Sequence, residues 1–125
     1  MITGCSVKIN SSHQLFNISD IYYYSWMLGE DERATDIIIE INNPGESVEF
    51  KSITYRGIEV PVSITDKGKT LIVKGTINTG KSTIENLQYT ATGEPDRIYY
   101  LYNGSQHSYP LINIRREDTR YFKKQ

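Results

Sequence analysis

The sequence contains a single cysteine, Cys5, and only two histidines, His13 and His107, among its 125 residues. One cysteine excludes an internal disulfide and a zinc site built from cysteines. The two histidines are far apart, and neither has a second metal-ligating residue at the usual spacing. We therefore expect no metal site and no cofactor. No apolar run reaches the roughly 18 residues that a helix needs to cross a bilayer.

The chain also lacks an excess of charge of either sign, because its net charge is −1. A nucleic-acid partner is therefore not expected. The charges are unevenly spread: residues 1–62 carry 4 basic and 9 acidic side chains, whereas residues 63–125 carry 10 basic and 6 acidic ones. We interpret the acidic run at 30–32 and the basic end of the chain as solvated surface.

The residues that are present suit one folded domain. The composition is 38% hydrophobic and 11% aromatic, which is enough for one core and excludes a disordered chain. We divide the sequence into residues 1–17, a tether or first strand, residues 18–115, the folded domain, and residues 116–125, a charged tail.

Apolar side chains alternate with a period of two, which is typical of β-strands. Residues 21–28 place Tyr22, Tyr24 and Trp26 on one face, and residues 36–41 place three isoleucines inward, Ile37, Ile39 and Ile41. Aromatic and β-branched side chains favour such half-buried strands. The segment 42–45, Asn-Asn-Pro-Gly, predicts the turn that follows.

Further short strands follow, separated by turn residues. Residues 48–55 predict a strand with Ile53 and Tyr55 on one face and Val48 and Phe50 on the other. Turns are expected at 56–57, 66–69 and 78–81, and a further strand at 87–92. The clearest hairpin joins residues 97–102 to a return strand through Asn103-Gly104, a pair that favours a type I′ turn, and Pro110 predicts an edge position in that return strand.

Eight or nine short strands with no helical spacing predict an all-β protein. We expect an antiparallel β-sandwich of about eight strands, immunoglobulin-like but without the disulfide of antibody domains.

One motif invites a catalytic interpretation. Residues 75–82 match the phosphate-loop pattern G-x-x-x-x-G-K-[ST], in which Lys81 would contact phosphate and Ser82 magnesium. However, only 43 residues follow Ser82, too few for the parallel strands and helices of a nucleotide-binding sheet. We interpret the match as a hairpin turn, and a small nucleotide hydrolase is the weakest alternative. We expect the protein not to be an enzyme.

Aromatic side chains supply the candidate ligand site. If the domain binds a ligand, we expect the contacts at Tyr22, Tyr24 and Trp26 and at the last hairpin, through Asn103 and Tyr109. The alternative is that these rings form core and cross-strand pairs.

The first residues suggest a lipid anchor. Ile2-Thr3-Gly4-Cys5 matches the end of a bacterial lipoprotein signal, in which lipid is attached to the cysteine. The polar residues that follow would suit a tether between a membrane and the domain. We expect attachment at Cys5 and a location in the cell envelope. The alternative is an ordinary lone thiol in a cytoplasmic domain.

Part of the sequence resembles a group of short proteins from Bacteroidota. The resemblance rests on Ile18–Trp26, Gly29, the strand 36–41 and Phe50–Gly57, together with the closing hairpin. Members of that group are secreted or lipid-anchored proteins whose function is not known, so the resemblance implies location and fold but no chemistry. The leading hypothesis is a non-enzymatic, lipid-anchored binding or structural module of the envelope, with a protein or glycan partner and a membrane contact only through the anchor. The alternative is a soluble carbohydrate- or peptide-binding module.

Overall fold

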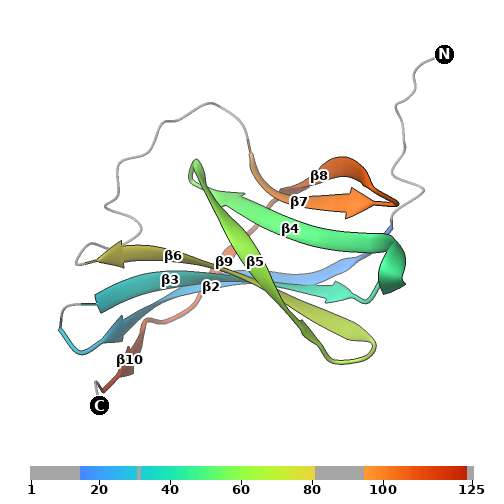
Figure 1. Cartoon of the computed structure of the whole chain (residues 1–125). Coiled ribbons are helices and arrows are strands. Elements are labelled where there is room, and N and C mark those ends of the chain that lie inside the picture. Colours follow the sequence, from blue (N-terminus) through green and yellow to red (C-terminus); the bar gives the residue numbers. More distant parts are fainter. Residues whose placement is uncertain (1–14, 31, 81–94, 124–125) are drawn as a thin grey trace.

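A computed structural model describes residues 15–30, 32–80 and 95–123 (Figure 1). Apart from one short 3-10 turn, Gly45–Ser47, the secondary structure of these residues is entirely β, as predicted. The strands are β2 (Ile18–Leu28), β3 (Glu32–Asn42), β4 (Val48–Tyr55), β5 (Ile58–Asp66), β6 (Thr70–Gly80), β7 (Asp96–Tyr102), β8 (Ser105–Leu111), β9 (Arg115–Arg116) and β10 (Arg120–Phe122). No helix long and apolar enough to cross a membrane occurs within these ranges.

The strands form one continuous sheet in the order β10-β2-β3-β6-β5-β4-β7-β8, with β9 also paired to β2. All neighbours are antiparallel except β9 and β10, which run parallel to β2. The all-β, antiparallel prediction is therefore confirmed. The structure does not show two separate sheets, as the predicted immunoglobulin-like sandwich requires, but one open sheet that curls into a half-barrel.

Strand β5 explains why the sheet curls instead of dividing in two. Its first half, Ile58–Pro61, pairs with β4, and its second half, Val62–Asp66, pairs with β6. In Figure 1, β5 crosses from the layer of β4 and β7 to the layer of β3 and β6. Pro61 stands where the strand changes partners, and proline, which has no N–H to donate, is found in sheets at such irregular positions.

The core fills the inside of the curl. Ile37, Ile39 and Ile41 on β3 are fully buried, as the alternation predicted, and they belong to one cluster with Val73 of β6 and Ile98 of β7. Burial of these aliphatic side chains is the main favourable term in the folding of such a sheet.

A β-bulge alters the predicted faces of β4. The register of β4 shifts between Phe50 and Ser52, so Val48 and Phe50 point into the core together with Ile53 and Tyr55. The prediction that these two pairs face opposite ways is therefore wrong, because one extra residue in a strand reverses the alternation.

The turns follow the sequence with one exception. Arg56-Gly57 and Asn103-Gly104 both have positive φ at two successive residues, as type I′ hairpins require. Of the turn predicted at 78–81, residues 78–80 are the end of β6, where Asn78 and Gly80 still pair with β3, and Lys81 lies outside the described residues. Pro110 lies in β8, which ends the sheet order, so its predicted edge position is confirmed. The strand predicted at 87–92 lies outside the described residues.

Candidate functional site

Three of the predicted ligand-binding side chains form a row on the outer face of β2. This aromatic row consists of Tyr22, Tyr24 and Trp26, which are half-buried and do not belong to the core cluster. The rings of Tyr22 and Tyr24 are stacked, with centroids 6.5 Å apart. The core side of the strand is taken instead by Tyr23, whose ring packs against Tyr55 at 5.5 Å. The row is therefore not part of the core, although Tyr24 and Tyr22 do contact side chains of β3 across the strands.

A buried carboxylate lies beneath the aromatic row. Asp36 on β3 is opposite Tyr24 and only 7% exposed. Its Oδ1 accepts hydrogen bonds from Trp26 Nε1 at 3.2 Å and Thr76 Oγ1 at 2.7 Å, and its Oδ2 accepts one from the Tyr24 hydroxyl at 3.1 Å. Burial and the charge of Asp36 raise the pKa of Tyr24 above its ordinary value, so this hydroxyl stays protonated and keeps donating.

The C-terminal segment, residues 115–122, lies along the edge of β2 and places two guanidinium groups on the aromatic row. The Cζ atom of Arg115 is 5.2 Å from the centroid of the Tyr22 ring, and that of Arg120 is 3.7 Å from the centroid of Tyr24. Arg115 also binds both carboxylate oxygens of Asp20, at 2.8 and 3.2 Å. The hydrogen bond from Arg115 holds the pKa of Asp20 below its usual value, so this pair persists until strongly acidic pH.

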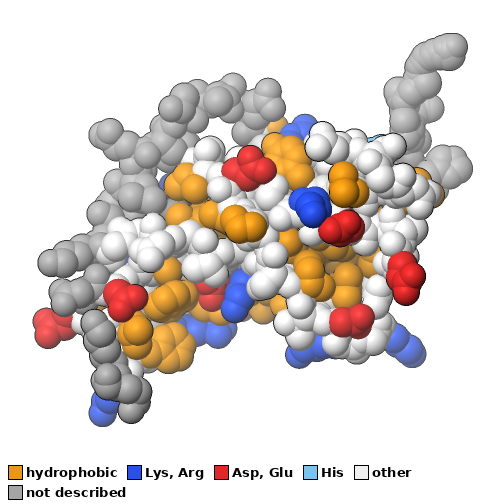
Figure 2. Space-filling view, in the orientation of Figure 1, with side chains coloured by type: hydrophobic (Ala, Val, Ile, Leu, Met, Phe, Trp, Pro, Cys, Tyr) orange, Lys and Arg blue, Asp and Glu red, His pale blue; other side chains and the backbone are white. Residues whose placement is uncertain are grey.

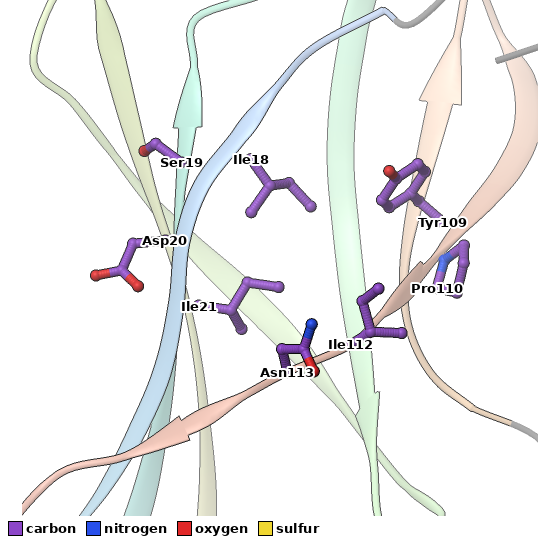
Figure 3. Close-up of a pocket in the computed structure, with 8 residues that line it drawn as sticks. All are labelled: Ile18, Ser19, Asp20, Ile21, Tyr109, Pro110, Ile112 and Asn113. Atoms are coloured by element: carbon purple, nitrogen blue, oxygen red, sulfur yellow. The ribbon is translucent and has the colours of Figure 1, made fainter.

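Next to the row, the open side of the half-barrel contains a hollow of about 300 Å³, which we call the seam hollow. It lies between β2 on one side and β8 with the connector to β9 on the other. In Figure 3, Ile18 and Ile21 point into this space from β2 and face Tyr109 and Ile112 across it. The complete lining is Ile18, Ser19, Asp20, Ile21, Tyr109, Pro110, Ile112 and Asn113.

A second β-bulge brings two apolar side chains into the lining. The register of β2 shifts between Ile18 and Asp20, which brings Ile18 and Ile21 onto the same face although they are three residues apart. Figure 3 shows Ser19 and Asp20 directed away from the hollow. On the other side, the Tyr109 ring is fixed by an edge contact with Phe16, with centroids 5.9 Å apart.

The mouth of the hollow exposes more apolar surface than sequence reasoning found. Tyr109, a predicted ligand residue, is 36% exposed, and Ile112, which the sequence analysis missed, is 67% exposed. The missed signal was an isoleucine two residues after Pro110, directly after the end of β8 at Leu111. Figure 2 shows further hydrophobic side chains gathered near the end of the chain, where Tyr121 and Phe122 of β10 are exposed.

The remaining predicted residues are elsewhere. Asn103 lies in the exposed turn at the other end of β8 from Tyr109, does not line the hollow, and donates its backbone N–H to the Ser47 carbonyl at 3.0 Å. Cys5, the predicted lipid attachment site, lies outside the described residues, as does His13. His107 stacks on the ring of Tyr100, with centroids 5.6 Å apart.

The phosphate-loop-like segment is a strand as far as it is described. Gly75 pairs with Ile37 of β3, and Gly80 pairs with Arg33. Within residues 75–80 only Gly80 has a positive φ, +65°, and strand residues in a ladder cannot wrap their amides around a phosphate as that loop does. Lys81 and Ser82 lie outside the described residues. Within the ranges that the structure covers, no three His, Cys, Asp or Glu side chains are grouped so that they could hold a metal ion.

Comparison with known proteins assigns no family, since no family model, curated protein or solved structure matches the chain. Function is therefore inferred from the geometry of β2 and its surroundings.

Proposed function

We propose that this protein is a non-enzymatic binding module, and that the seam hollow receives an apolar side chain of an extended polypeptide. The observation that carries the proposal is the hollow itself, in which Ile18, Ile21, Tyr109 and Ile112 converge from two sides of an open sheet. Ligand sites are typically concave and combine apolar side chains with a few polar groups, and the lining of this hollow contains both kinds. Asn113 supplies one of the polar groups, an amide.

The backbone of β2 indicates why the ligand is a polypeptide. On the edge of β2 that faces away from β3, β9 pairs with Tyr22 and Tyr23 and β10 with Trp26–Leu28. Within the described chain, the same edge has no partner strand at Ile18–Ile21, directly beside the hollow. An added strand can form main-chain hydrogen bonds at such an edge and place one side chain in a neighbouring pocket. Strand β8 is less suited to pair with an added strand, because Pro110 has no N–H to donate.

The arrangement of the aromatic row favours a peptide over a carbohydrate. A sugar ring would stack on an open aromatic face. The rings of Tyr22 and Tyr24 are instead approached by the guanidinium groups of Arg115 and Arg120. What supports the non-enzymatic part is the position of residues 75–80 in β6 rather than in a phosphate-binding loop.

The binding site is tested by two matched substitutions of exposed isoleucines. The probe is the blocked pentapeptide acetyl-Thr-Thr-Leu-Thr-Thr-amide, with the same peptide carrying Asn in place of Leu as its control. We expect Ile112→Asp to weaken binding of the Leu peptide at least about tenfold, because it places a charge at the mouth of the hollow. Ile64→Asp, at a position 43% exposed on β5, should change the affinity by less than about twofold.

Calorimetric titration of the three proteins measures these affinities. Equal losses in Ile112→Asp and Ile64→Asp, or equal binding of the Leu and Asn peptides, would contradict the proposed site.

We also propose that the module is tethered to a bacterial envelope through lipid on Cys5. The support is the sequence Ile2-Thr3-Gly4-Cys5 and the polar residues after it. Intact-mass analysis of protein from the native cell should show a diacylglycerol-sized addition that is lost in Cys5→Ala. An unmodified thiol would remove the anchor and favour the cytoplasmic alternative.

A further inference from the structure

Two arginine side chains of the C-terminal segment lie on the aromatic row of β2, and Phe122 adds an edge contact with the Trp26 ring, with centroids 6.5 Å apart. Arg115 is opposite Tyr22 and Arg120 opposite Trp26 in the parallel register. Both arginines are exposed, as are Tyr121 and Phe122. Two main-chain hydrogen bonds outside the strand ladders, Glu117 N to Tyr23 O at 2.8 Å and Gly29 N to Phe122 O at 3.1 Å, complete the attachment.

Each guanidinium has the surroundings that recognise arginine specifically. Arg115 donates hydrogen bonds to both carboxylate oxygens of Asp20 and to Glu117 Oε2 at 2.9 Å, and it lies over the Tyr22 ring. Arg120 lies over Tyr24 at 3.7 Å and donates to Glu117 Oε1 at 3.4 Å. A planar guanidinium can stack on a ring and donate in a fork at the same time, whereas the ammonium group of lysine cannot.

The surface beneath the segment is acidic and belongs to the sheet. Asp20 lies on β2, and Asp36 and Glu40 lie on β3 beside the aromatic row, where they accept hydrogen bonds from Tyr24 and Tyr22. These carboxylates and rings are arranged by the antiparallel β2–β3–β6 ladder and would remain if the segment left. On the sheet, Arg115 thus meets the carboxylate of Asp20 and the Tyr22 ring, and Arg120 meets the Tyr24 ring, and none of these groups belongs to the segment.

The contacts between the C-terminal segment and β2 are of kinds that break easily. Only five of its residues are in the ladder with β2, and its ion pairs are between solvent-exposed side chains. Exposed ion pairs contribute little and are screened by salt, and chain ends are the first parts of a fold to open.

We propose that the outer face and edge of β2 form a recognition site for an extended, arginine-bearing strand of a partner protein, and that residues 115–122 occupy this site in the unbound molecule. The segment acts as an internal competitor. A partner can bind only those molecules in which the segment has left β2, so the apparent affinity for the partner decreases as that fraction of molecules decreases. This site lies beside the seam hollow and shares Asp20 with its lining, but the arginine contacts that support it do not involve the apolar side chains of the hollow.

The test uses the full chain with Arg115→Gln and Arg120→Gln, which alters the segment and leaves β2 unchanged. The probe is a synthetic peptide of residues 114–122, Ile-Arg-Arg-Glu-Asp-Thr-Arg-Tyr-Phe. Its matched control has lysine at the two positions that correspond to 115 and 120, with the same net charge. Amide spectra report release of the segment, and peptide titration reports binding.

We expect the double variant to release the segment and to bind the arginine peptide at least about tenfold more tightly than the lysine peptide. Adding Tyr24→Leu to this host should remove the preference, whereas Tyr24→Phe, which keeps the ring, should retain it. Equal binding of the two peptides, or no binding to a host with a released segment, would overturn the proposal. A segment that stays in place without its arginines would also overturn it. A dimer of the unaltered chain that the arginine peptide dissociates would overturn the choice of a foreign partner and identify a second copy as the occupant.

Discussion

Asp36 shows how a single residue organises the outer face of the sheet. A carboxylate that is 7% exposed is costly unless it is hydrogen-bonded. The three donors that the structure gives it, on Tyr24, Trp26 and Thr76, are all neutral and come from the two flanking strands. The carboxylate therefore fixes the aromatic row from below, which prepares that row to receive guanidinium groups from above.

Replacement of Asp36 should therefore cost stability. We expect Asp36→Ala to lower the free energy of unfolding by about 3 kcal/mol, because it leaves three donors without their acceptor. Asp36→Asn should cost about 1 kcal/mol, since the amide oxygen still accepts but its NH₂ group cannot. Urea denaturation measures both.

Glu40→Ala is the matched control for this substitution. Glu40 is less buried and accepts one long hydrogen bond, from the Tyr22 hydroxyl at 3.4 Å, so its loss should cost less than about 1 kcal/mol. If Asp36→Ala cost no more than Glu40→Ala, Asp36 would not be what holds the row together.

At the scale of elements, the sequence predicted where most strands and turns lie but not how the strands bend. The alternation of Ile37, Ile39 and Ile41 located β3 and its inner face correctly. In β4 the apolar side chains change from even-numbered positions, 48 and 50, to odd-numbered positions, 53 and 55. In β2 the same change occurs between positions 18 and 21. Each change coincides with a β-bulge, so a break in the alternation of apolar residues could have predicted where the strands bend.

The last hairpin is an element whose turn chemistry can be tested directly. Gly104 has φ +84° and nothing within 4 Å of an added Cβ, so Gly104→Ala should cost about 1–2 kcal/mol through backbone strain alone. Ser105→Ala, at the exposed start of β8, should stay within about 0.5 kcal/mol of the unaltered chain. Thermal unfolding compares the two. Equal stabilities would mean that the turn relaxes to another type.

At the scale of the whole molecule, the feature that sequence patterns could not supply is the continuity of the sheet. Eight strands of about the right length suit a sandwich, a barrel or a half-barrel equally well. The choice depends on β5, which pairs with β4 over its first half and β6 over its second. Such non-local pairing is not written in local alternation, although Pro61 stands at the crossing.

The candidate site was predictable only in part for the same reason. Tyr22, Tyr24, Trp26 and Tyr109 were identified because aromatic side chains carry binding energy wherever they lie. The seam hollow joins β2 to residues some ninety positions later, and Ile112 gains its importance only because the half-barrel brings these segments together. The role of Arg115 and Arg120 depends on the parallel register with β2, which no local pattern reveals.

The central claim is that ligands bind along the open edge of β2, and amide-resolved NMR titration of the unaltered chain with acetyl-Thr-Thr-Leu-Thr-Thr-amide tests it most directly. We expect saturable shifts confined to the amides of Ile18–Ile21, of Tyr109 and of residues 111–113, and none with the Asn control peptide. Shifts that gather on β4, β5 or β6, or no saturable shifts at all, would contradict it.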